Sequence, residues 1–254
     1  MYKIPANTLF IGQNLIFVPE CHSTNTLASE LAVQSRLSDG TVVITANQTA
    51  GRGQRGNSWQ SAAGRNLTFS IFLRPTFLSP RNQFFLTMAA SLAVADFLTS
   101  LSLDAVKIKW PNDVLVGRKK ISGILIENAI QGESIQQSIV GIGLNVNQQT
   151  FDLSLATSLV AFTNEMTDLN VALSALLVCF ERRYFQAREG NYDRLRTDYL
   201  QQLYGLGQLQ RFHSSDGPFE GLIEDVNEKG ELIILKAGRP LIFNLKEISF
   251  VLTD

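Results

Sequence analysis

The chain has 254 residues, a formal net charge of −1 and 45% hydrophobic residues, which suits one large domain or one domain with a small second one. A net charge so close to zero gives no electrostatic reason to expect nucleic acid as the main partner. Two cysteines and two histidines make neither a disulfide framework nor a convincing metal cluster, and the first residues carry no signal-peptide pattern, so we expect a cytoplasmic protein without a membrane partner.

The first predicted elements are a short strand at Leu15–Val18 and a helix that runs to about Arg36. This helix is expected to turn three apolar side chains inward: Leu27, Leu31 and Val33. Three polar residues stand at its start: Ser23, Thr24 and Asn25. A hydroxyl there can cap the helix, but a cap requires only one of the three. A plain N-cap and a ligand site therefore stay equally open.

A glycine- and arginine-rich segment, Thr49–Phe69, follows a buried strand at Gly40–Asn47 and runs into an alternating strand at Asn66–Leu73. It contains Gly51, Gly53, Gly56, Gly64, Arg52, Arg55, Arg65 and Trp59. Glycines let a backbone approach a ligand closely, guanidinium groups bind phosphate or carboxylate, and an indole offers a flat face to a ring. The segment therefore suits a loop that folds over a nucleotide, with a basic surface loop as the alternative.

This segment differs from two common nucleotide-binding motifs. The sequence contains no G-x-x-x-x-G-K-[ST] string of the Walker type. Its G-x-G-x-x-G string, Gly51–Gly56, leads toward a strand, whereas the dinucleotide-binding fingerprint opens a helix that receives the pyrophosphate. A Rossmann-type site is therefore disfavoured.

Polar residues follow the next predicted strand. A core helix at Gln83–Ser102 precedes a strand at Val106–Trp110, and Pro111 then stops that strand. The turn presents Asn112 and Asp113 at the strand end. Ligands commonly bind beside such strand ends in open α/β folds, so we expect both side chains to face a ligand.

Three further strands are predicted: Val114–Val116, Ile121–Glu127 and Ser138–Val146. Lys120 precedes the second, and its ammonium either meets a ligand or extends into solvent from the hairpin tip. Gly141 and Gly143 lie in the third. Glycines there leave room for a ligand or a neighbouring backbone, and a strand bulge is the open alternative.

The last part of the chain changes in texture. Helices are predicted at Asp168–Gln186 and Tyr192–Leu203, and Gly205 breaks the helical pattern. Short strands follow at Gln208–Arg211, Phe219–Val226, Leu232–Leu235, Leu241–Leu245 and Ile248–Leu252. This spacing indicates a small β-barrel-like module. We therefore expect two domains, residues 1–205 and residues 206–254.

Several motifs now stand in one order: Ser23-Thr24-Asn25, Gln48-Thr49-Ala50-Gly51-Arg52-Gly53-x-x-Gly56, Trp59, Lys109-Trp110-Pro111-Asn112-Asp113, Lys120-x-x-Gly123-Ile124-Leu125 and Gly141-Ile142-Gly143-x-Asn145. In this combination the chain resembles biotin protein ligase over almost its whole length, in the short form without an N-terminal DNA-binding domain. The resemblance implies an α+β fold. Its catalytic domain would be a mixed β-sheet flanked by helices, like that of class II aminoacyl-tRNA synthetases, with a small C-terminal SH3-like β-barrel.

The resemblance also implies a two-step reaction. Biotin and MgATP would give biotinyl-5′-adenylate and pyrophosphate, and a lysine of a biotin carboxyl carrier protein domain would then take the biotinyl group. Biotin and ATP with Mg²⁺ are thus expected as substrates, with Mg²⁺ near Asp113 and no tightly bound cofactor. A homodimer of the family type is possible, whereas the family's repressor role is not implied.

By the same resemblance the catalytic residues are Lys120, Arg52 and Asp113. The implied biotin-binding residues are Ser23, Thr24, Asn25, Gln48, Gly51, Arg52, Gly53, Gln54, Lys120, Gly123 and Gly141. The implied ATP- or adenylate-binding residues are Arg52, Arg55, Trp59, Lys109, Asn112, Lys120 and Asn145. Lys120 and Arg52 would contact the biotin carboxylate and the α-phosphate, and Trp59 would pack on the adenine when the loop closes.

The sequence departs from the family pattern at two positions that are expected to affect how tightly the adenylate is bound. Many relatives carry arginine at the position of Gln54, and some carry arginine at the position of Val251 in the small domain. Two other functions stay open. A lipoate or octanoyl ligase shares the acyl-lysine chemistry but resembles this chain less in the glycine-arginine loop. A non-enzymatic vitamin sensor would not need Lys120, Arg52 and Asp113 together.

Overall fold

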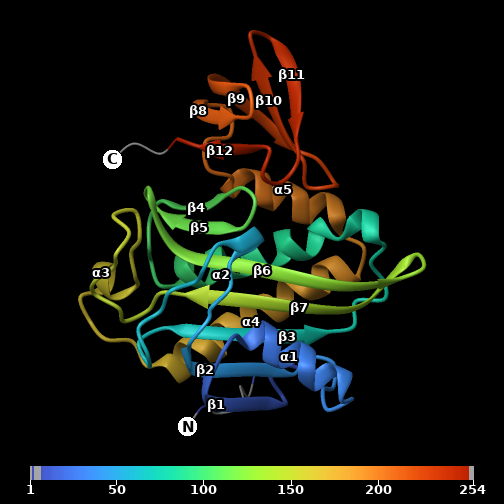
Figure 1. Ribbon diagram of the computed structural model, residues 1–254, viewed down its shortest axis with the longest axis vertical. Helices are drawn as coiled ribbons and strands as arrows, with labels where there is room; N and C mark the ends of the chain where they lie inside the picture. Colours follow the sequence, from blue (N-terminus) through green and yellow to red (C-terminus); the bar gives the residue numbers. More distant parts are fainter. Residues whose placement is uncertain (1, 3–6, 252–254) are drawn as a thin grey trace.

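The structure is a computed structural model that describes residue 2 and residues 7–251, and two β-sheets organise it (Figure 1). The larger sheet of the described chain has seven strands in the order β1-β2-β3-β7-β6-β5-β4. β1 and β2 run parallel, and the other neighbours run antiparallel. The strands are β1 (Leu15–Cys21), β2 (Val42–Gln48), β3 (Leu67–Leu73), β4 (Val106–Lys109), β5 (Asp113–Val116), β6 (Lys119–Gln131) and β7 (Ser134–Leu144).

Strand β3 separates a core face from a pocket face. Its sequence LTFSIFL alternates, and Leu67, Phe69 and Ile71 are buried in the main core. Thr68 and Ser70 point to the opposite face, where Ser70 contacts the start of the first helix. One strand thus contributes both to the core and to the floor of a polar site.

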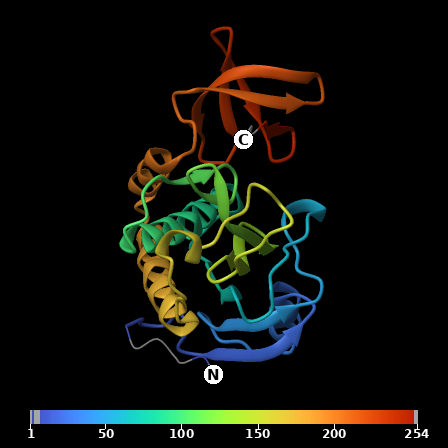
Figure 2. The ribbon, with the colours of Figure 1, turned by 90° about the vertical axis from the view of Figure 1, so that its left-hand side faces the viewer.

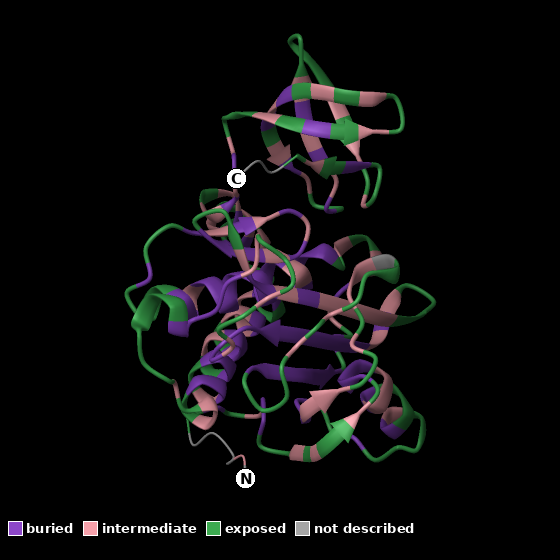
Figure 3. Ribbon diagram, turned by 60° about the vertical axis from the view of Figure 1, so that its left-hand side comes forward, coloured by how far each residue is buried: buried purple, intermediate pink, exposed green. Residues whose placement is uncertain are grey.

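Helices cover both faces of the larger sheet: α1 (Thr24–Val33), α2 (Phe84–Ser100), α4 (Leu169–Arg188) and α5 (Tyr192–Gln202); the short α3 (Val160–Thr163) lies beside the sheet (Figure 1). α1 lies on the front in Figure 1 and packs on Val43, Phe72 and Ile139. α2 and α4 lie behind the sheet, and α5 packs against them. Figure 3 shows the resulting burial, which concentrates in the central strands and in the helices behind them.

Helix α2 is apolar on almost every side because it lies between the sheet and two other helices. Residues 80–100 are long and apolar enough to cross a membrane by length and composition, but 72% of this window is buried inside the protein. That burial is what a core helix requires. The helix predicted at Gln83–Ser102 is confirmed in this role.

An ion-pair network ties the three rear helices together. Arg183 of α4 donates to both carboxylate oxygens of Asp96 in α2, at 2.7 and 3.0 Å, and to Asp198 in α5 at 2.6 Å. Its side chain is only 15% exposed. Burial alone would lower the pKa of Arg183, but the bonds to Asp96 and Asp198 outweigh it and raise the pKa above its ordinary value.

The smaller sheet is antiparallel and has the order β11-β10-β9-β8-β12 among the described residues. Its strands are β8 (Leu209–Ser214), β9 (Gly217–Val226), β10 (Leu232–Lys236), β11 (Arg239–Phe243) and β12 (Ile248–Phe250). Figure 2 shows them as a compact module above the larger sheet. The predicted α+β fold with a C-terminal SH3-like module is confirmed. Of the strand predicted at Ile248–Leu252, Leu252 lies outside the described residues.

The turn between β9 and β10 docks the small module onto the rear helices and strand β4. The indole Nε1 of Trp110 donates to the carbonyl oxygen of Gly230 at 2.9 Å. The ring of Phe84 fills the space beside Gly230, so that an added Cβ would lie 2.3 Å from a ring atom. Buried residues of both sheets belong to one continuous core. The domain division at Gly205 stays a prediction.

We expect Gly230→Ala to weaken this docking and to lower the free energy of unfolding by about 3 kcal/mol, as measured by urea denaturation. Gly238→Ala is the matched control, because both glycines have positive φ, 85° and 77°. Nothing lies within 4 Å of a Cβ added at Gly238, so this variant should lose only about 1 kcal/mol of backbone strain. Equal losses in the two variants would show that the contact with Phe84 does not hold the module.

Helix α1 differs from its prediction at both of its ends. Val33 is 85% exposed rather than inward, because α1 ends there and Ser35 adopts a left-handed φ of 56°. Ser23 occupies the N-cap position, but its side chain makes no capping hydrogen bond. The backbone N–H of Thr24 donates instead to the side-chain oxygen of Gln48 at 2.8 Å. A plain N-cap is therefore the wrong reading of this polar segment.

Candidate active site

A pocket of about 290 Å³ lies on the front face of the larger sheet. It is bounded by the start of α1, the glycine-arginine loop, the β4–β5 turn and the last strand of the small module. The structure brings most predicted site residues into its lining: Ser23, Thr24, Asn25, Gln48, Arg52, Gly53, Gln54, Trp59, Lys109, Asn112, Asp113, Lys120, Gly123 and Gly141. Predicted residues up to 118 positions apart, from Ser23 to Gly141, therefore share one site.

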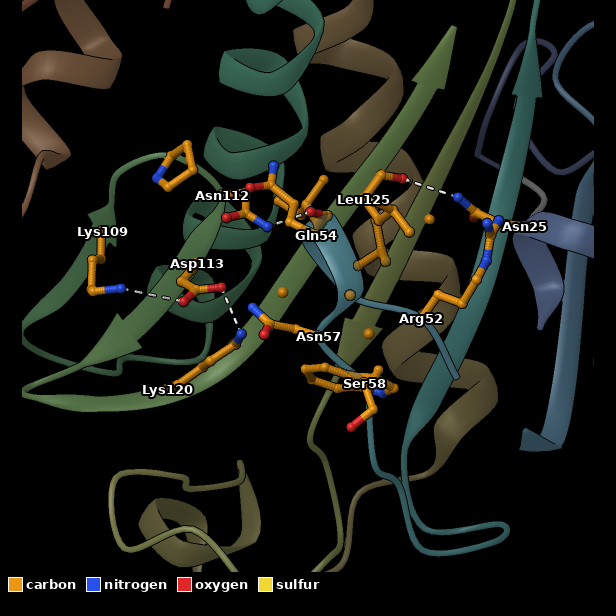
Figure 4. A pocket seen from close by; sticks show the side chains of 18 of the residues that line it. Asn25, Arg52, Gln54, Asn57, Ser58, Lys109, Asn112, Asp113, Lys120 and Leu125 are labelled. Atoms are coloured by element: carbon orange, nitrogen blue, oxygen red, sulfur yellow. Dashed lines mark hydrogen bonds and ion pairs between the residues drawn. The ribbon is translucent and has the colours of Figure 1, made fainter. Parts of the chain in front are cut away.

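One end of the pocket holds two lysines around a carboxylate (Figure 4). Asp113 Oδ1 lies 2.6 Å from Nζ of Lys120, and its Oδ2 lies 3.5 Å from Nζ of Lys109. The Asp113 side chain is 17% exposed. Strands β4, β5 and β6 run side by side, so short connections bring these three residues together. The arrangement leaves net positive charge where an anionic ligand would lie.

The β4–β5 turn is fixed to the neighbouring strand by Asn112. Its side-chain amide donates to the carbonyl oxygen of Ile124 at 2.6 Å, and the Ile124 amide donates back to the Asn112 carbonyl at 3.1 Å. Asn112 is 9% exposed. Its position supports the placement of Asp113, and its predicted contact with the nucleotide stays a prediction.

The other end of the pocket is a hydrogen-bonded polar network. Ser70 Oγ lies 2.7 Å from Oγ1 of Thr24 and 2.6 Å from Oδ1 of Asn25. Gln48 accepts from the Thr24 amide through Oε1, so its Nε2 is a donor on the other side. The amide of Asn25 donates to Glu127 Oε2 at 2.8 Å. These side chains converge from α1 and from β2, β3 and β6.

Arg52 is turned toward this polar end. Its guanidinium donates to Oε2 of Glu127 at 2.6 Å, and both side chains are half-exposed. Figure 4 shows Arg52 reaching toward Asn25, away from Lys120 and Asp113. The structure therefore does not place Arg52 beside Lys120, where the resemblance expects both to meet one anion.

The glycine-arginine loop folds back on itself. Gly53 donates to the carbonyl of Asn57 at 2.7 Å, and Trp59 donates to the carbonyl of Gly51 at 2.9 Å. A Cβ on Gly51 would lie 2.3 Å from the Trp59 carbonyl oxygen, so only glycine allows the two limbs to approach so closely. Gly51 shapes the loop and lies outside the pocket lining. Arg55 lies in the 3₁₀ turn Gln54–Gly56, and its predicted contact stays a prediction.

The indole of Trp59 packs against the glycines of β6 and β7. A Cβ on Gly143 would lie 2.3 Å from an indole atom, and a Cβ on Gly123 would lie 3.3 Å from another. Nζ of Lys120 lies 5.7 Å from the ring centroid. Gly141 leaves room for Asn25 in the same way, because a Cβ on Gly141 would lie 2.3 Å from Oδ1 of Asn25. The absence of side chains at these glycines thus leaves room for Trp59 and Asn25. A strand bulge, the alternative explanation for the glycines, would not account for these contacts.

Asn145 is placed away from the pocket. It is 4% exposed, and its side-chain amide donates to the Thr157 carbonyl at 2.9 Å. The residue follows β7 and lies outside the pocket lining. Its predicted adenosine contact therefore stays a prediction without support from this geometry.

The small module contributes residues that the sequence did not reveal. Lys246 and Phe250 line the pocket, and the Phe250 ring lies 5.3 Å from Nζ of Lys109. Val251, where some relatives are expected to carry arginine, is 44% exposed and outside the lining. No local pattern marks Lys246 or Phe250. Ser70 could have been found, because the alternation of β3 places it on the polar face.

The charged residues of the pocket do not form a metal cage. The described part of the chain contains no group of three or more histidine, cysteine, aspartate or glutamate side chains that could hold a metal ion. Asp113 is the carboxylate residue among those that line the pocket. Mg²⁺ commonly binds through one or two carboxylates together with substrate phosphates. Asp113 fits this mode of binding.

Comparison with known proteins gives consistent matches. Residues 18–145 match the model of the biotin/lipoate A/B protein ligase family. The bifunctional ligase/repressor BirA of Bacillus spizizenii is 33% identical over 233 residues, which are 89% of this chain and 71% of that protein. The biotin–[acetyl-CoA-carboxylase] ligase of Mycobacterium tuberculosis is 31% identical over 242 residues, 93% of this chain and 88% of that protein.

Solved structures agree with the sequence matches. Biotin protein ligase from Aquifex aeolicus in complex with biotin and ATP superposes with a TM-score of 0.80 at 28% identity, covering 95% of this chain and 100% of that one. The shared fold includes both sheets, since almost the whole chain is covered. With the pocket geometry, the family model and relatives above 30% identity in agreement, the chain belongs to the biotin/lipoate A/B protein ligase family.

Proposed function

We propose that this protein is an ATP-dependent biotin ligase, which activates biotin as biotinyl-5′-AMP and transfers it to a lysine of a biotin carboxyl carrier protein domain. Family membership and the relatives named as biotin ligases support this function. The observation that carries it is a single pocket with two chemically distinct ends. A cluster of Lys109, Asp113 and Lys120 faces a hydrogen-bonded polar network across the same floor.

The polar end is complementary to a cyclic urea. A serine hydroxyl has one proton, and the oxygen of Asn25 can only accept, so Ser70 donates to Asn25 and accepts from Thr24. Asn25 Oδ1 and Thr24 Oγ1 then offer acceptors, and Gln48 Nε2 offers a donor. A urea presents two N–H donors and one carbonyl acceptor. The apolar ring of lipoate would leave these groups without partners, which disfavours the lipoate alternative.

The cationic end suits the first chemical step. A carboxylate oxygen of biotin attacks the α-phosphorus of ATP, the bond from that phosphorus to the β-phosphate oxygen breaks, and pyrophosphate leaves. Both reactants are anions, so positive groups must offset the charge that concentrates in the transition state. Lys120 and Lys109 supply this charge. Mg²⁺, held by Asp113 and the phosphates, would supply further positive charge when ATP binds.

In the second step, the amine of the carrier lysine attacks the acyl carbon of the adenylate. The carbon–oxygen bond to the phosphate breaks, AMP leaves, and the nitrogen loses a proton to solvent. Asp113 would stabilise the ammonium that develops on the attacking nitrogen. Arg52 would leave Glu127 and join the adenylate when the loop closes, and closure would exclude water from the anhydride.

Mass spectrometry of an isolated carrier domain tests this function. The domain is incubated with the protein, biotin and MgATP, with lipoate in a parallel reaction. We expect a biotin-sized mass gain on the carrier lysine that requires ATP. A gain with lipoate alone would assign the sister activity. Binding of labelled biotin without any gain would favour a sensor. The cytoplasmic location, the identity of the carboxylase and a homodimer remain predictions.

The seat of Trp59 gives a prediction for nucleotide binding. We expect Gly143→Ala to raise the KM for ATP about tenfold, because the new Cβ would lie 2.3 Å from the indole and lift the loop. Gly123→Ala is a graded comparison, since its Cβ would lie 3.3 Å from the indole and 3.2 Å from Nζ of Lys120; the KM for ATP should rise only about twofold, and any loss of kcat would report the contact with Lys120. Steady-state pyrophosphate release measures both. An equal rise in the KM for biotin would contradict a role of Trp59 at the adenine.

A further inference from the structure

We propose that Glu127 is a positioning residue that fixes the side-chain amide of Asn25, so that Asn25 acts as a hydrogen-bond acceptor for a urea N–H of the substrate. This inference rests on the proposed function, because it takes biotin as the substrate. Glu127 lies within β6, two residues beyond Leu125 and therefore on the same face of the strand. It is not itself among the residues that line the pocket.

The partners of Asn25 determine which way its amide faces. Nδ2 lies 2.8 Å from Oε2 of Glu127 and 3.3 Å from the carbonyl oxygen of Leu125. A carboxylate and a carbonyl can only accept, so both protons of the amide nitrogen point toward them. Oδ1 must then face Ser70 and lie against Gly141, where the absence of a side chain leaves room for it. The orientation follows from chemistry and does not depend on an arbitrary assignment of the two amide atoms.

This orientation limits what Asn25 can offer a ligand. Both of its N–H groups are used, and one lone pair of Oδ1 accepts from Ser70 at 2.6 Å. The remaining capacity is a single acceptor site on Oδ1. Without Glu127, only the longer bond to the Leu125 carbonyl would hold the amide, because Ser70 can donate or accept equally well. A turned amide would present N–H to the N–H of the substrate, which is unfavourable.

Arg52 completes the arrangement. Its guanidinium donates to the same Oε2 atom of Glu127 at 2.6 Å, so the carboxylate is held between the loop and α1. One oxygen therefore links the urea end of the pocket to the arginine of the glycine-arginine loop. Substituting glutamine separates the two roles, because its side-chain oxygen still accepts from Asn25 while the charge facing Arg52 is lost.

The test measures binding of biotin and of an N-methylated probe by isothermal titration calorimetry without ATP. Biotin can be methylated on either of its two urea nitrogens. The probe is the one of these two isomers that the wild-type protein binds more weakly. We expect Glu127→Leu to weaken biotin binding about tenfold and probe binding less than about twofold, because one hydrogen bond is worth about a factor of ten. We expect Glu127→Gln to bind biotin within about threefold of wild type.

Glu220→Gln is the matched control, since Glu220 forms a comparable ion pair with Arg211 at 2.8 Å in the small module. It should change neither affinity. Equal weakening of biotin and probe in Glu127→Leu would overturn the proposal in favour of a general structural role. A Glu127→Gln variant as weak as Glu127→Leu would also overturn it, because the charge rather than the acceptor would then matter. Wild-type protein that binds no biotin would instead refute the proposed function itself.

Discussion

Lys120→Ala is expected to slow formation of biotinyl-adenylate by about a thousandfold, measured as pyrophosphate release at saturating biotin and ATP. Nζ of Lys120 lies 2.6 Å from Asp113 and faces the pocket. Its removal would leave Asp113 with Lys109 at the longer distance of 3.5 Å, so the site would lose its nearest positive charge. The attacking carboxylate and the α-phosphate would then meet without that neutralising group.

The fold should survive this substitution. The backbone of Lys120, rather than its side chain, holds the segment behind it: its N–H donates to the Leu155 carbonyl at 2.7 Å, and its carbonyl accepts from Thr157 at 2.9 Å. Lys119→Ala is the matched control, because Lys119 is adjacent and exposed. It should keep wild-type activity. Unchanged pyrophosphate release in Lys120→Ala, or an equal loss in Lys119→Ala, would remove Lys120 from the mechanism.

Arg183→Ala is expected to have the largest effect on stability, lowering the free energy of unfolding by about 4 kcal/mol in urea denaturation. The substitution would leave Asp96 and Asp198 partly buried without their main partner, at 22% and 14% side-chain exposure. Each carboxylate would keep one exposed arginine, Arg182 beside Asp96 at 2.8 Å and Arg194 beside Asp198 at 2.9 Å, so the cost arises from carboxylates that are only partly compensated. α2, α4 and α5 would then lose the ion-pair network through Arg183 that connects them.

The expected loss can be separated from the general cost of removing an arginine. Arg211→Ala breaks an exposed pair with Glu220, in which the side chains are 68% and 52% exposed. Solvent screens that pair, so the loss should be about 0.5 kcal/mol. A double substitution of Arg183 and Asp96 should destabilise the protein less than the sum of the two single changes. Equal losses for Arg183→Ala and Arg211→Ala would show that the buried network contributes little.

The elements of this fold could be predicted because each carries a local periodic signal. The alternation in β3 and the apolar surface of α2 locate both elements to within two residues. The cluster of Lys109, Asp113 and Lys120 could also be predicted, because β4, β5 and β6 are consecutive and joined by short turns. Segments that are neighbours in sequence are also neighbours in space there, so few arrangements of these side chains are compatible with the fold.

Other parts of the site depend on contacts between distant segments. Ser70, Asn25 and Glu127 meet because β3, β7 and β6 are adjacent in one register, and alternation alone does not specify which strands pair. The approach of Lys246 and Phe250 depends on how the small module docks through Gly230 and Trp110. The direction of Arg52 depends on a carboxylate 75 positions away.

By itself, the sequence determined the order of the strands and of the longer helices, the two-sheet organisation and the residues able to bind a carboxylate and a phosphate, because periodicity and side-chain chemistry are local properties; it did not reveal the four-residue helix α3. Only the tertiary structure decided which of these residues share a wall of the pocket, that Trp59 rests on Gly143, and that Asn25 is left with an acceptor. Strand register and domain docking arise from packing over long sequence separations, and short segments do not encode these contacts.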